Sequence, residues 1–259
     1  MTALEAISQG TPLAGIPSFT SIEKQRHWML EHMAGAFRVF ARKGYTEGMS
    51  GHISLRDPED PHTFWTNPLG KYFGLLTAGD MILVNYEGKA VGGNTSRPAN
   101  AAGFLIHGAL HKARPDVNAA CHTHSPYGKA WSTFARPVEM LNQDACMFYG
   151  ETQAVYDQFG GIVFSDEEGE RLATALGPKG KAMILRNHGL LTVGSTVDEA
   201  AYLFTLLERS CEVQLMVEAA AANGIPKQYV GDAEAAYTHK MVNDAVSACL
   251  IPKPFHLED

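Results

Sequence analysis

The chain has 259 residues, of which 45% are hydrophobic and 19% are charged, a composition typical of a folded chain that buries a full core. The formal net charge of −7, without a prominent cluster of Lys and Arg, argues against a nucleic-acid partner. No run approaches the roughly 18 apolar residues that a membrane span requires, so a membrane partner is not expected either.

The N-terminal segment 1–20 has no basic start and no sustained apolar stretch, so we expect a flexible lead-in and not a secretory signal. The cysteines lie far apart without CxxC spacing, which favours reduced, mostly buried thiols and a cytoplasmic protein. They are Cys121, Cys146, Cys211 and Cys249. No repeat or linker-like change in composition is present, so we expect one domain over residues 21–259.

The first half of the chain contains a helix and then strands. Thr20 and Glu23 form a capping-box pattern before apolar residues on one helical face, which predicts an amphipathic helix ending at Gly44. Segments 51–57 and 81–88 have strand patterns, and we expect a loop between them because that stretch is rich in Pro and Gly.

The second half alternates helices and strands. Segment 98–113 has helical spacing and is followed by a strand pattern over 117–124. Ser165-x-x-Glu168 predicts a helix ending near Gly177, 181–194 predicts two short strands around a turn, and Thr196-x-x-Glu199 predicts the start of a long amphipathic helix. This alternation indicates an α/β layered domain.

The stretch "NAACHTHSPYG" contains two histidines one residue apart. On a strand, His122 and His124 project to the same side, and two imidazoles so placed can hold one divalent ion at about 2.0 to 2.1 Å if a third ligand is supplied. His188 in "RNHGLL", at a turn beside a glycine, is the best candidate for that third ligand. From spacing alone, two surface histidines on an edge strand and a hydrogen-bonded turn residue are the favoured explanation, because short motifs often match by chance.

Four segments in this order and spacing resemble the class II aldolase/adducin family across roughly residues 25 to 220. They are "GHIS" (51–54), "TNPLG" (66–70), "ARPDVNAACHTHS" (113–125) and "RNHGLLTVG" (186–194). Within the family, the chain resembles the fungal and bacterial proteins named after L-fuculose-phosphate aldolase. The resemblance implies a three-layer α/β/α domain on a mostly antiparallel sheet, assembled as a homotetramer with active sites at subunit interfaces.

The resemblance also implies the activity. His122, His124 and His188 match the family's metal-binding histidines, usually for Zn²⁺, with Fe²⁺ or Mn²⁺ as other divalent choices. The implied enzyme is a metal-dependent lyase that cleaves a carbon–carbon bond of a small ketose or ketose phosphate, such as L-fuculose 1-phosphate. A Lewis-acidic ion would stabilise the enediolate that this cleavage leaves.

The chain departs from that pattern at one important place. Sugar-phosphate aldolases of the family carry a glutamate, preceded by two serines, at the start of the helix before the RPD segment; it binds the metal and serves as acid and base. Counting back from Arg114-Pro115-Asp116, the glutamate position is Gly103 and the serines become Ala101 and Ala102. Another group must therefore move the proton.

The candidates for this proton transfer are Asp144 and Tyr149 in "NQDACMFYG" and His52 in "GHIS". Glu47 is a further carboxylate close in sequence to the glycine-rich turn. Each also has a structural explanation, as a turn cap, a core aromatic or a solvated side chain, and acid/base assignment requires geometry.

Glycine-containing turns supply candidate anion contacts through their backbone N–H groups. The expected contacts to a phosphate or carboxylate are Gly51, Ser54, Asn67 and Gly70. Lys71 and Tyr72 could add a charge and a hydroxyl group, although Lys71 could equally face solvent.

Two other functions remain open. A three-histidine site without the glutamate also suits a metal-dependent decarboxylase or a non-haem iron oxygenase acting on a keto or hydroxy acid. The aromatic-rich "HTFWTNPLGKYFG" could line a pocket for an acid that carries a ring, or it could pack the core. Adducin uses this fold as a non-catalytic interaction module, but a scaffold has no chemical reason to keep three histidines in register.

Overall fold

The fold is organised around one mixed sheet. The structure, a computed structural model, describes residues 16–160 and 166–242, and within them the strands follow the order β4-β3-β2-β1-β5-β8-β7-β6. All neighbouring strands are antiparallel except β6 and β7. The strands are β1 (His52–Arg56), β2 (Thr63–Thr66), β3 (Ile82–Asn85), β4 (Ala90–Gly93), β5 (Ala119–Thr123), β6 (Gln153–Tyr156), β7 (Ala182–Leu185) and β8 (Gly189–Gly194).

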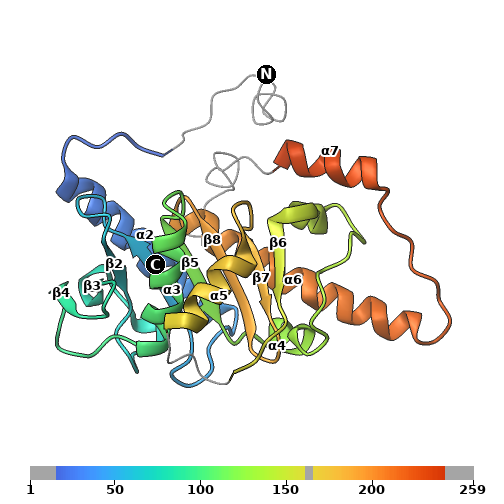
Figure 1. The fold of residues 1–259 in the computed structure, drawn as a ribbon, viewed down its shortest axis with the longest axis horizontal. Helices are drawn as coiled ribbons and strands as arrows, with labels where there is room; N and C mark the ends of the chain where they lie inside the picture. Colours follow the sequence, from blue (N-terminus) through green and yellow to red (C-terminus); the bar gives the residue numbers. More distant parts are fainter. Residues whose placement is uncertain (1–15, 161–165, 243–259) are drawn as a thin grey trace.

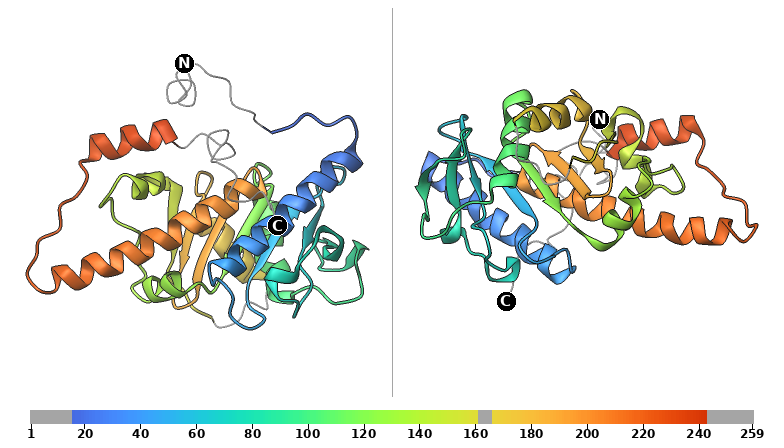
Figure 2. Two further views of the ribbon diagram at one scale, coloured as in Figure 1. Left: turned by 180° about the vertical axis from the view of Figure 1, so that it is seen from behind. Right: turned by 60° about the horizontal axis from the view of Figure 1, so that its bottom comes forward.

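Helices cover both faces of this sheet (Figures 1 and 2). α3 (Ala101–Ala113) and α5 (Asp166–Leu176) lie on one face, and α2 (Ile22–Arg42) and α6 (Val197–Ala221) lie on the other. The arrangement confirms the expected α/β/α layers around a mostly antiparallel sheet. The remaining helical segments are α4 (Pro126–Ser132), α7 (Asp232–Val242) and the short 3₁₀ turns η1 (Phe73–Leu75), η2 (Ala78–Asp80), η3 (Asp144–Phe148) and η4 (Gly150–Thr152).

Two large apolar clusters and a small one of Phe64, Ile82 and Val84 fill the spaces between the layers. The larger one packs α2 and α6 against the sheet and includes the fully buried rings of Phe37, Phe40 and Phe204. The second one packs α3 and α5 against the opposite face and includes Leu110 and Leu191. Because both faces are covered, the central strands are buried along their whole length instead of alternating.

The ends of two long helices test the expected capping patterns. α2 begins one residue later than the predicted Thr20 cap, because Ser21 has the extended backbone of an N-cap and its Oγ accepts from the Lys24 amide at 3.3 Å. α6 has the predicted cap, with Thr196 Oγ1 accepting from the Glu199 amide at 3.1 Å. The predicted cap of α5, Ser165, lies outside the described residues.

The expectation of a loop between segments 51–57 and 81–88 is wrong in its central part. Residues Thr63–Thr66 form β2, which pairs with β1 on one side and with β3 on the other. The Pro and Gly residues on both sides of it are loop signals, but Thr-Phe-Trp-Thr itself has the β-branched and aromatic side chains of a buried strand. The edge strand β4 was not predicted either.

The thiols of Cys121, Cys146 and Cys211 are free and buried, as expected, and Cys249 lies outside the described residues. Across 16–160 and 166–242, no helix combines the length and the apolarity needed to cross a membrane.

Candidate metal centre

Three strand ends meet at one end of the sheet and place the predicted metal histidines together. In the antiparallel pairing, His52 at the start of β1 lies opposite His122 near the end of β5. His122 in turn lies opposite Leu191, close to the start of β8. His124 follows the end of β5, and His188 immediately precedes β8, so both lie at the same end as His122.

The imidazoles of His122, His124 and His188 form a compact cluster. One ring nitrogen from each lies within 4.8 Å of the others. The ring centroids are 5.2 Å apart for His122 and His124, 4.7 Å for His122 and His188, and 4.8 Å for His124 and His188. The fold thus brings together all three ligands predicted from the sequence.

The turn between β7 and β8 aims His188 at this cluster. Asn187 has a left-handed backbone with φ of 56°, and the His188 amide donates to the carbonyl of Leu185 at 3.0 Å, which closes the turn. At Gly189, a Cβ atom would lie 2.8 Å from the carbonyl oxygen of Thr123. The glycine therefore permits the close approach of β8 to Thr123, which lies between His122 and His124.

Hydrogen bonding and burial prepare the His122 ring for a metal. Its Nδ1–H donates to the carbonyl of Leu190 at 2.8 Å, which leaves the lone pair on Nε2. Burial lowers the pKa of His122 well below its usual value and lowers the pKa of His188 to about 4. Burial, with the nearby Lys129 cation, also lowers the pKa of His124. All three rings are thus neutral ligands at pH 7.

A buried carboxylate fixes the segment that carries His124. Glu208 of α6 accepts hydrogen bonds from the Tyr127 and Gly128 amides, at 2.8 and 2.7 Å, and from the Ser125 hydroxyl. These amides are the free donors at the first turn of α4, so the carboxylate caps this helix from a distant element. Burial raises the pKa of Glu208.

This donor set fits a divalent metal ion. Three neutral imidazoles match the ligand number of catalytic zinc sites, which keep further positions open for water or substrate. Imidazole nitrogens also suit iron, copper and nickel, so the ligands alone do not distinguish these metals.

His52 lies beside the cluster and occupies the space next to Gly103. Its ring centroid is 5.0 Å from that of His122, and its side chain is buried. A Cβ atom on Gly103 would lie 2.9 Å from Cγ and 3.0 Å from Cδ2 of His52. At the position where the resemblance places a glutamate, the His52 ring therefore fills the side-chain space. This packing joins β1 and α3 and has no signal in the sequence of either.

The predicted anion contacts have different surroundings. Gly51 has φ of +98°, and a Cβ atom there would lie 3.2 Å from the carbonyl of His122, so this glycine lets the turn approach the metal strand. Ser54 is fully buried and its hydroxyl bonds to His107 and His111. Asn67 is buried at the end of β2.

Gly70, the fourth predicted anion contact, lines a groove beside the 47–52 turn. The groove also contains Lys71, Tyr72 and Arg97. Lys71 is paired with Asp80 at 2.6 Å. Arg97 makes no ion pair within the described residues, and one of its terminal nitrogens lies 4.0 Å from the Cβ position of Gly70. Arg97 lies in a polar loop without a recognisable motif, so no sequence signal points to it.

Asp144 and Tyr149 lie away from the histidine cluster. The Tyr149 hydroxyl donates to Asp232 of α7 at 2.6 Å. Asp144 is exposed. Burial raises the pKa of Tyr202, in the first half of α6, and the nearby Asp144 carboxylate raises it further. Glu208, which reaches the His124 segment, lies six residues further along the same helix. Glu47 is paired with Lys129 at 2.8 Å.

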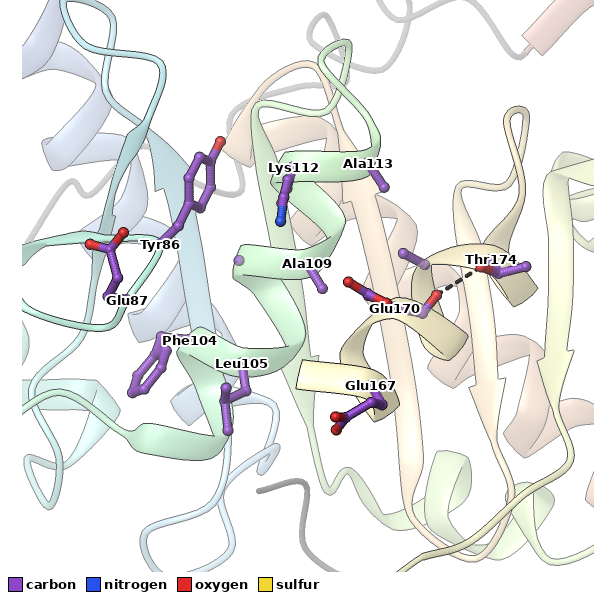
Figure 3. Close-up of a pocket in the computed structure, with 12 residues that line it drawn as sticks. Tyr86, Glu87, Phe104, Leu105, Ala109, Lys112, Ala113, Glu167, Glu170 and Thr174 are labelled. Atoms are coloured by element: carbon purple, nitrogen blue, oxygen red, sulfur yellow. Dashed lines mark hydrogen bonds between the residues drawn. The ribbon is translucent and has the colours of Figure 1, made fainter. Parts of the chain in front are cut away.

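A larger groove lies on the other side of α3 and contains none of the predicted site residues. It runs between α3, α5 and the turn after β3, with Tyr86, Phe104 and Lys112 among its lining residues (Figure 3). His107 and His111 lie on the opposite face of α3, where they are buried against the sheet.

The chain is similar to known proteins of one family. The family described as Class II Aldolase and Adducin N-terminal domain matches residues 31–215. Decarboxylase NovR of Streptomyces niveus is 44% identical over 79% of this chain and 75% of its own length. The 4-hydroxy-3-prenylphenylpyruvate oxygenase/4-hydroxy-3-prenylbenzoate synthase of Streptomyces roseochromogenus is 43% identical over 82% and 76%.

A solved structure extends the match over nearly the whole chain. L-fuculose 1-phosphate aldolase from Glaciozyma antarctica superposes with a TM-score of 0.84 and 40% identity, covering 97% of this chain and 94% of that one. The family match includes the three histidines and the Gly103 position, so it encompasses both the retained and the altered part of the site. This chain belongs to the class II aldolase and adducin family.

Proposed function

We propose that this protein is a metal-dependent enzyme that cleaves the bond between a carboxyl group and its neighbouring carbon in a small keto or hydroxy acid. The observation that carries the proposal is the packing of His52 on Gly103, where a Cβ atom would lie 2.9 and 3.0 Å from two atoms of the ring. This packing leaves no room for the glutamate that sugar-phosphate aldolases use to deprotonate a hydroxyl group.

The proposed metal ligands are His122, His124 and His188. A divalent ion held there, zinc or iron, supplies Lewis-acid stabilisation of negative charge on substrate oxygens. In a 3-oxo acid the breaking bond leaves its electron pair in an enolate, which then takes a proton, and carbon dioxide departs. This reaction needs no group to remove a hydroxyl proton first, which suits a site built around Gly103.

The chain's own residues would bind and orient the acid. The Arg97 guanidinium is a suitable partner for a second anionic group, because charge-assisted hydrogen bonds from Arg to a carboxylate are strong and directional. Tyr72 and Leu75 line the same groove and are 55% and 66% exposed, so they offer apolar surface to a ring. His52, next to the cluster, is the candidate for contact with the reacting atoms.

The names of two relatives support an acid substrate. One is a decarboxylase, and the name of the other joins oxygenation of a phenylpyruvate to synthesis of a benzoate. An oxidative variant of the reaction would need dioxygen as the second substrate and iron as the metal.

The second candidate is aldol cleavage of a small ketose or ketose phosphate, with L-fuculose 1-phosphate as the first substrate to try. The similarity to the Glaciozyma antarctica enzyme, at 40% identity over 97% of this chain, favours it. In that case the acid/base group must have moved from position 103 to another residue, and His52 is the nearest titratable side chain to that position.

Metal analysis and three parallel assays test the proposal. Elemental analysis of the purified protein should find about one zinc or iron per chain, and His122→Ala, His124→Ala and His188→Ala should each lose it while remaining folded. Carbon dioxide release from benzoylacetate, oxygen uptake with 4-hydroxyphenylpyruvate and cleavage of L-fuculose 1-phosphate are then measured with and without a chelator. Chelator-sensitive activity on either acid supports the proposal, whereas cleavage of the sugar phosphate alone replaces it with the aldolase. A protein that takes up no metal from Zn²⁺ or Fe²⁺ overturns both.

A further inference from the structure

Four buried polar side chains from β1 and α3 form one continuous series of hydrogen bonds. His52 Nδ1 lies 3.0 Å from His107 Nε2, and His107 Nδ1 lies 2.8 Å from Ser54 Oγ. Ser54 Oγ lies 2.8 Å from His111 Nε2, and His111 Nδ1 lies 3.1 Å from the carbonyl oxygen of Val117. All four side chains are at most 3% exposed.

The far end of this series has a fixed direction. The carbonyl of Val117 can only accept, so His111 Nδ1 must carry the proton and donate it. Arg56 holds the same carbonyl through its Nη2 at 2.9 Å and can only donate, so it offers no alternative acceptor. Burial, together with the Arg56 cation, lowers the pKa of His111 to about 3, so the ring is neutral and its Nε2 is an acceptor.

Each further bond then has one possible direction. The Ser54 hydroxyl donates its only proton to His111 Nε2, so its oxygen accepts from His107 Nδ1–H. His107 is fully buried, and burial lowers its pKa well below the usual value, so its Nε2 is an acceptor as well. His52 must therefore donate from Nδ1, which leaves its Nε2 without a proton.

The opposite set of donors and acceptors is unfavourable at the carbonyl of Val117. If His52 carried its proton on Nε2, every donor and acceptor in the series would exchange roles, and the lone pair of His111 Nδ1 would face the carbonyl oxygen of Val117. An unpaired buried acceptor costs about 1 to 3 kcal/mol. The orientation of the His52 ring is also restricted, because the backbone of α3 at Gly103 packs against its Cγ and Cδ2 atoms.

We propose that Ser54, His107 and His111 are positioning residues that hold His52 in the Nδ1–H tautomer and present its Nε2 as a hydrogen-bond acceptor beside the three metal histidines. Within the described residues, Nε2 of His52 makes no hydrogen bond, so it is free to accept one from a substrate hydroxyl group or a water molecule. The role toward substrate rests on the proposed function, but the tautomer follows from the hydrogen bonds alone.

The experiment reads the tautomer directly. The full chain is labelled with ¹⁵N-histidine and treated with a chelator, and the ring nitrogens are assigned by long-range ¹H–¹⁵N correlation at pH 7.5, where protonated and unprotonated imidazole nitrogens resonate far apart. We expect a proton on Nδ1 of His52, His107 and His111 and none on their Nε2 atoms. A proton on Nε2 of His52 in the wild-type protein overturns the proposal, whether or not any variant folds.

A pair of serine variants tests the positioning role. Ser54→Ala removes the hydroxyl that joins His107 to His111, so His52 should change from one tautomer to a mixture. Ser210→Ala removes another buried hydroxyl, which donates to the carbonyl of Leu206 in α6, and should leave the His52 signals unchanged. An unaltered single tautomer in folded Ser54→Ala contradicts the role of the series. Because none of these readings needs metal or turnover, failure of the proposed function would be seen separately, as absent metal uptake or absent activity.

Discussion

At the scale of single residues, the groove that contains Gly70, Lys71 and Arg97 has one cation without an ion-pair partner in the described part of the chain. Lys71 is neutralised by Asp80 at 2.6 Å, whereas Arg97 is exposed and borders Gly70. A guanidinium that binds a substrate anion contributes about 1.5 to 3 kcal/mol. We therefore expect Arg97→Ala to raise KM about 10- to 100-fold for whichever acidic substrate is turned over, with metal content unchanged.

The matched control is Arg209→Ala, which removes an exposed arginine that pairs with Glu212 on the surface of α6. Steady-state kinetics on the two variants should separate them clearly. Equal KM values for Arg97→Ala and the wild type would show that this groove does not bind the substrate's anionic group.

The residues that could be found from the sequence are those whose geometry is local. His122 and His124 share a strand face because of their spacing. The sequence Asn187-His188-Gly189 itself predicts the turn before β8. The relation of His52 to Gly103 and the series through Ser54 could not be found in this way, because they join β1 to α3 across about 50 positions of sequence. The spacing of His107 and His111, four residues apart on one helical face, was the only local signal for that series.

At the scale of elements, the contact between α3 and β1 sets the geometry beside the metal cluster. Gly103→Ala places a methyl carbon 2.9 Å from a ring that is held by His107, so the ring or the helix must move. Overpacking of this kind costs about 1 to 3 kcal/mol, more than the roughly 1 kcal/mol that alanine gains over glycine in a helix. We expect a lower free energy of unfolding and displaced His52 signals, measured by urea denaturation and NMR.

The same helix provides the control. At Gly108, the nearest atom to an added Cβ is 3.7 Å away, on Phe64, which is an ordinary contact. Gly108→Ala should therefore be neutral or stabilising by up to about 1 kcal/mol. If both variants behave alike, the contact between His52 and α3 is not tight, and position 103 has room for a side chain.

The one strand missed between segments 51–57 and 81–88 shows the limit of local patterns for elements. β2 has only four residues, and the Pro and Gly on both sides of it are genuine turn signals. Its stability comes from pairing on both edges, with Trp65 opposite Leu55 and Leu83. Such non-local pairing decides short strands more than intrinsic propensity does, so the sheet order was not accessible from the sequence.

At the scale of the whole molecule, the buried histidines make folding sensitive to acid. His107 and His111 are neutral in the folded state, because burial lowers the pKa of His107 well below its usual value and that of His111 to about 3. In the unfolded chain both take a proton near pH 6.5. The stability that these neutral rings contribute to the folded state is therefore complete above pH 6.5. It is lost as the pH falls toward their pKa values in the folded protein.

We expect the free energy of unfolding of the chelator-treated protein to fall below pH 6.5 by up to about 1.4 kcal/mol per pH unit for each of these two histidines. Urea titrations at pH 7.5, 6.5, 5.5 and 4.5 measure this slope. His111→Gln, which removes one of the two groups, should show a shallower decline than the wild type. A free energy that is constant between pH 7.5 and 4.5 would mean that these rings are protonated inside the folded protein.

The largest scale is the assembly, which we propose is a tetramer, as the family resemblance implies. The end of α6 and the segment leading to α7 extend beyond the sheet (Figures 1 and 2). Their side chains Met216, Ile225 and Tyr229 are 61%, 62% and 58% exposed, and exposed apolar groups of this kind mark contact surfaces. Gel filtration with light scattering should give the mass of four chains of 28.1 kDa each. Ile225→Lys should shift the protein toward smaller species, whereas Val91→Lys on the edge strand β4 should not. A wild-type monomer at micromolar concentration would contradict the proposed tetramer. These exposed apolar side chains would then have to contact a different partner.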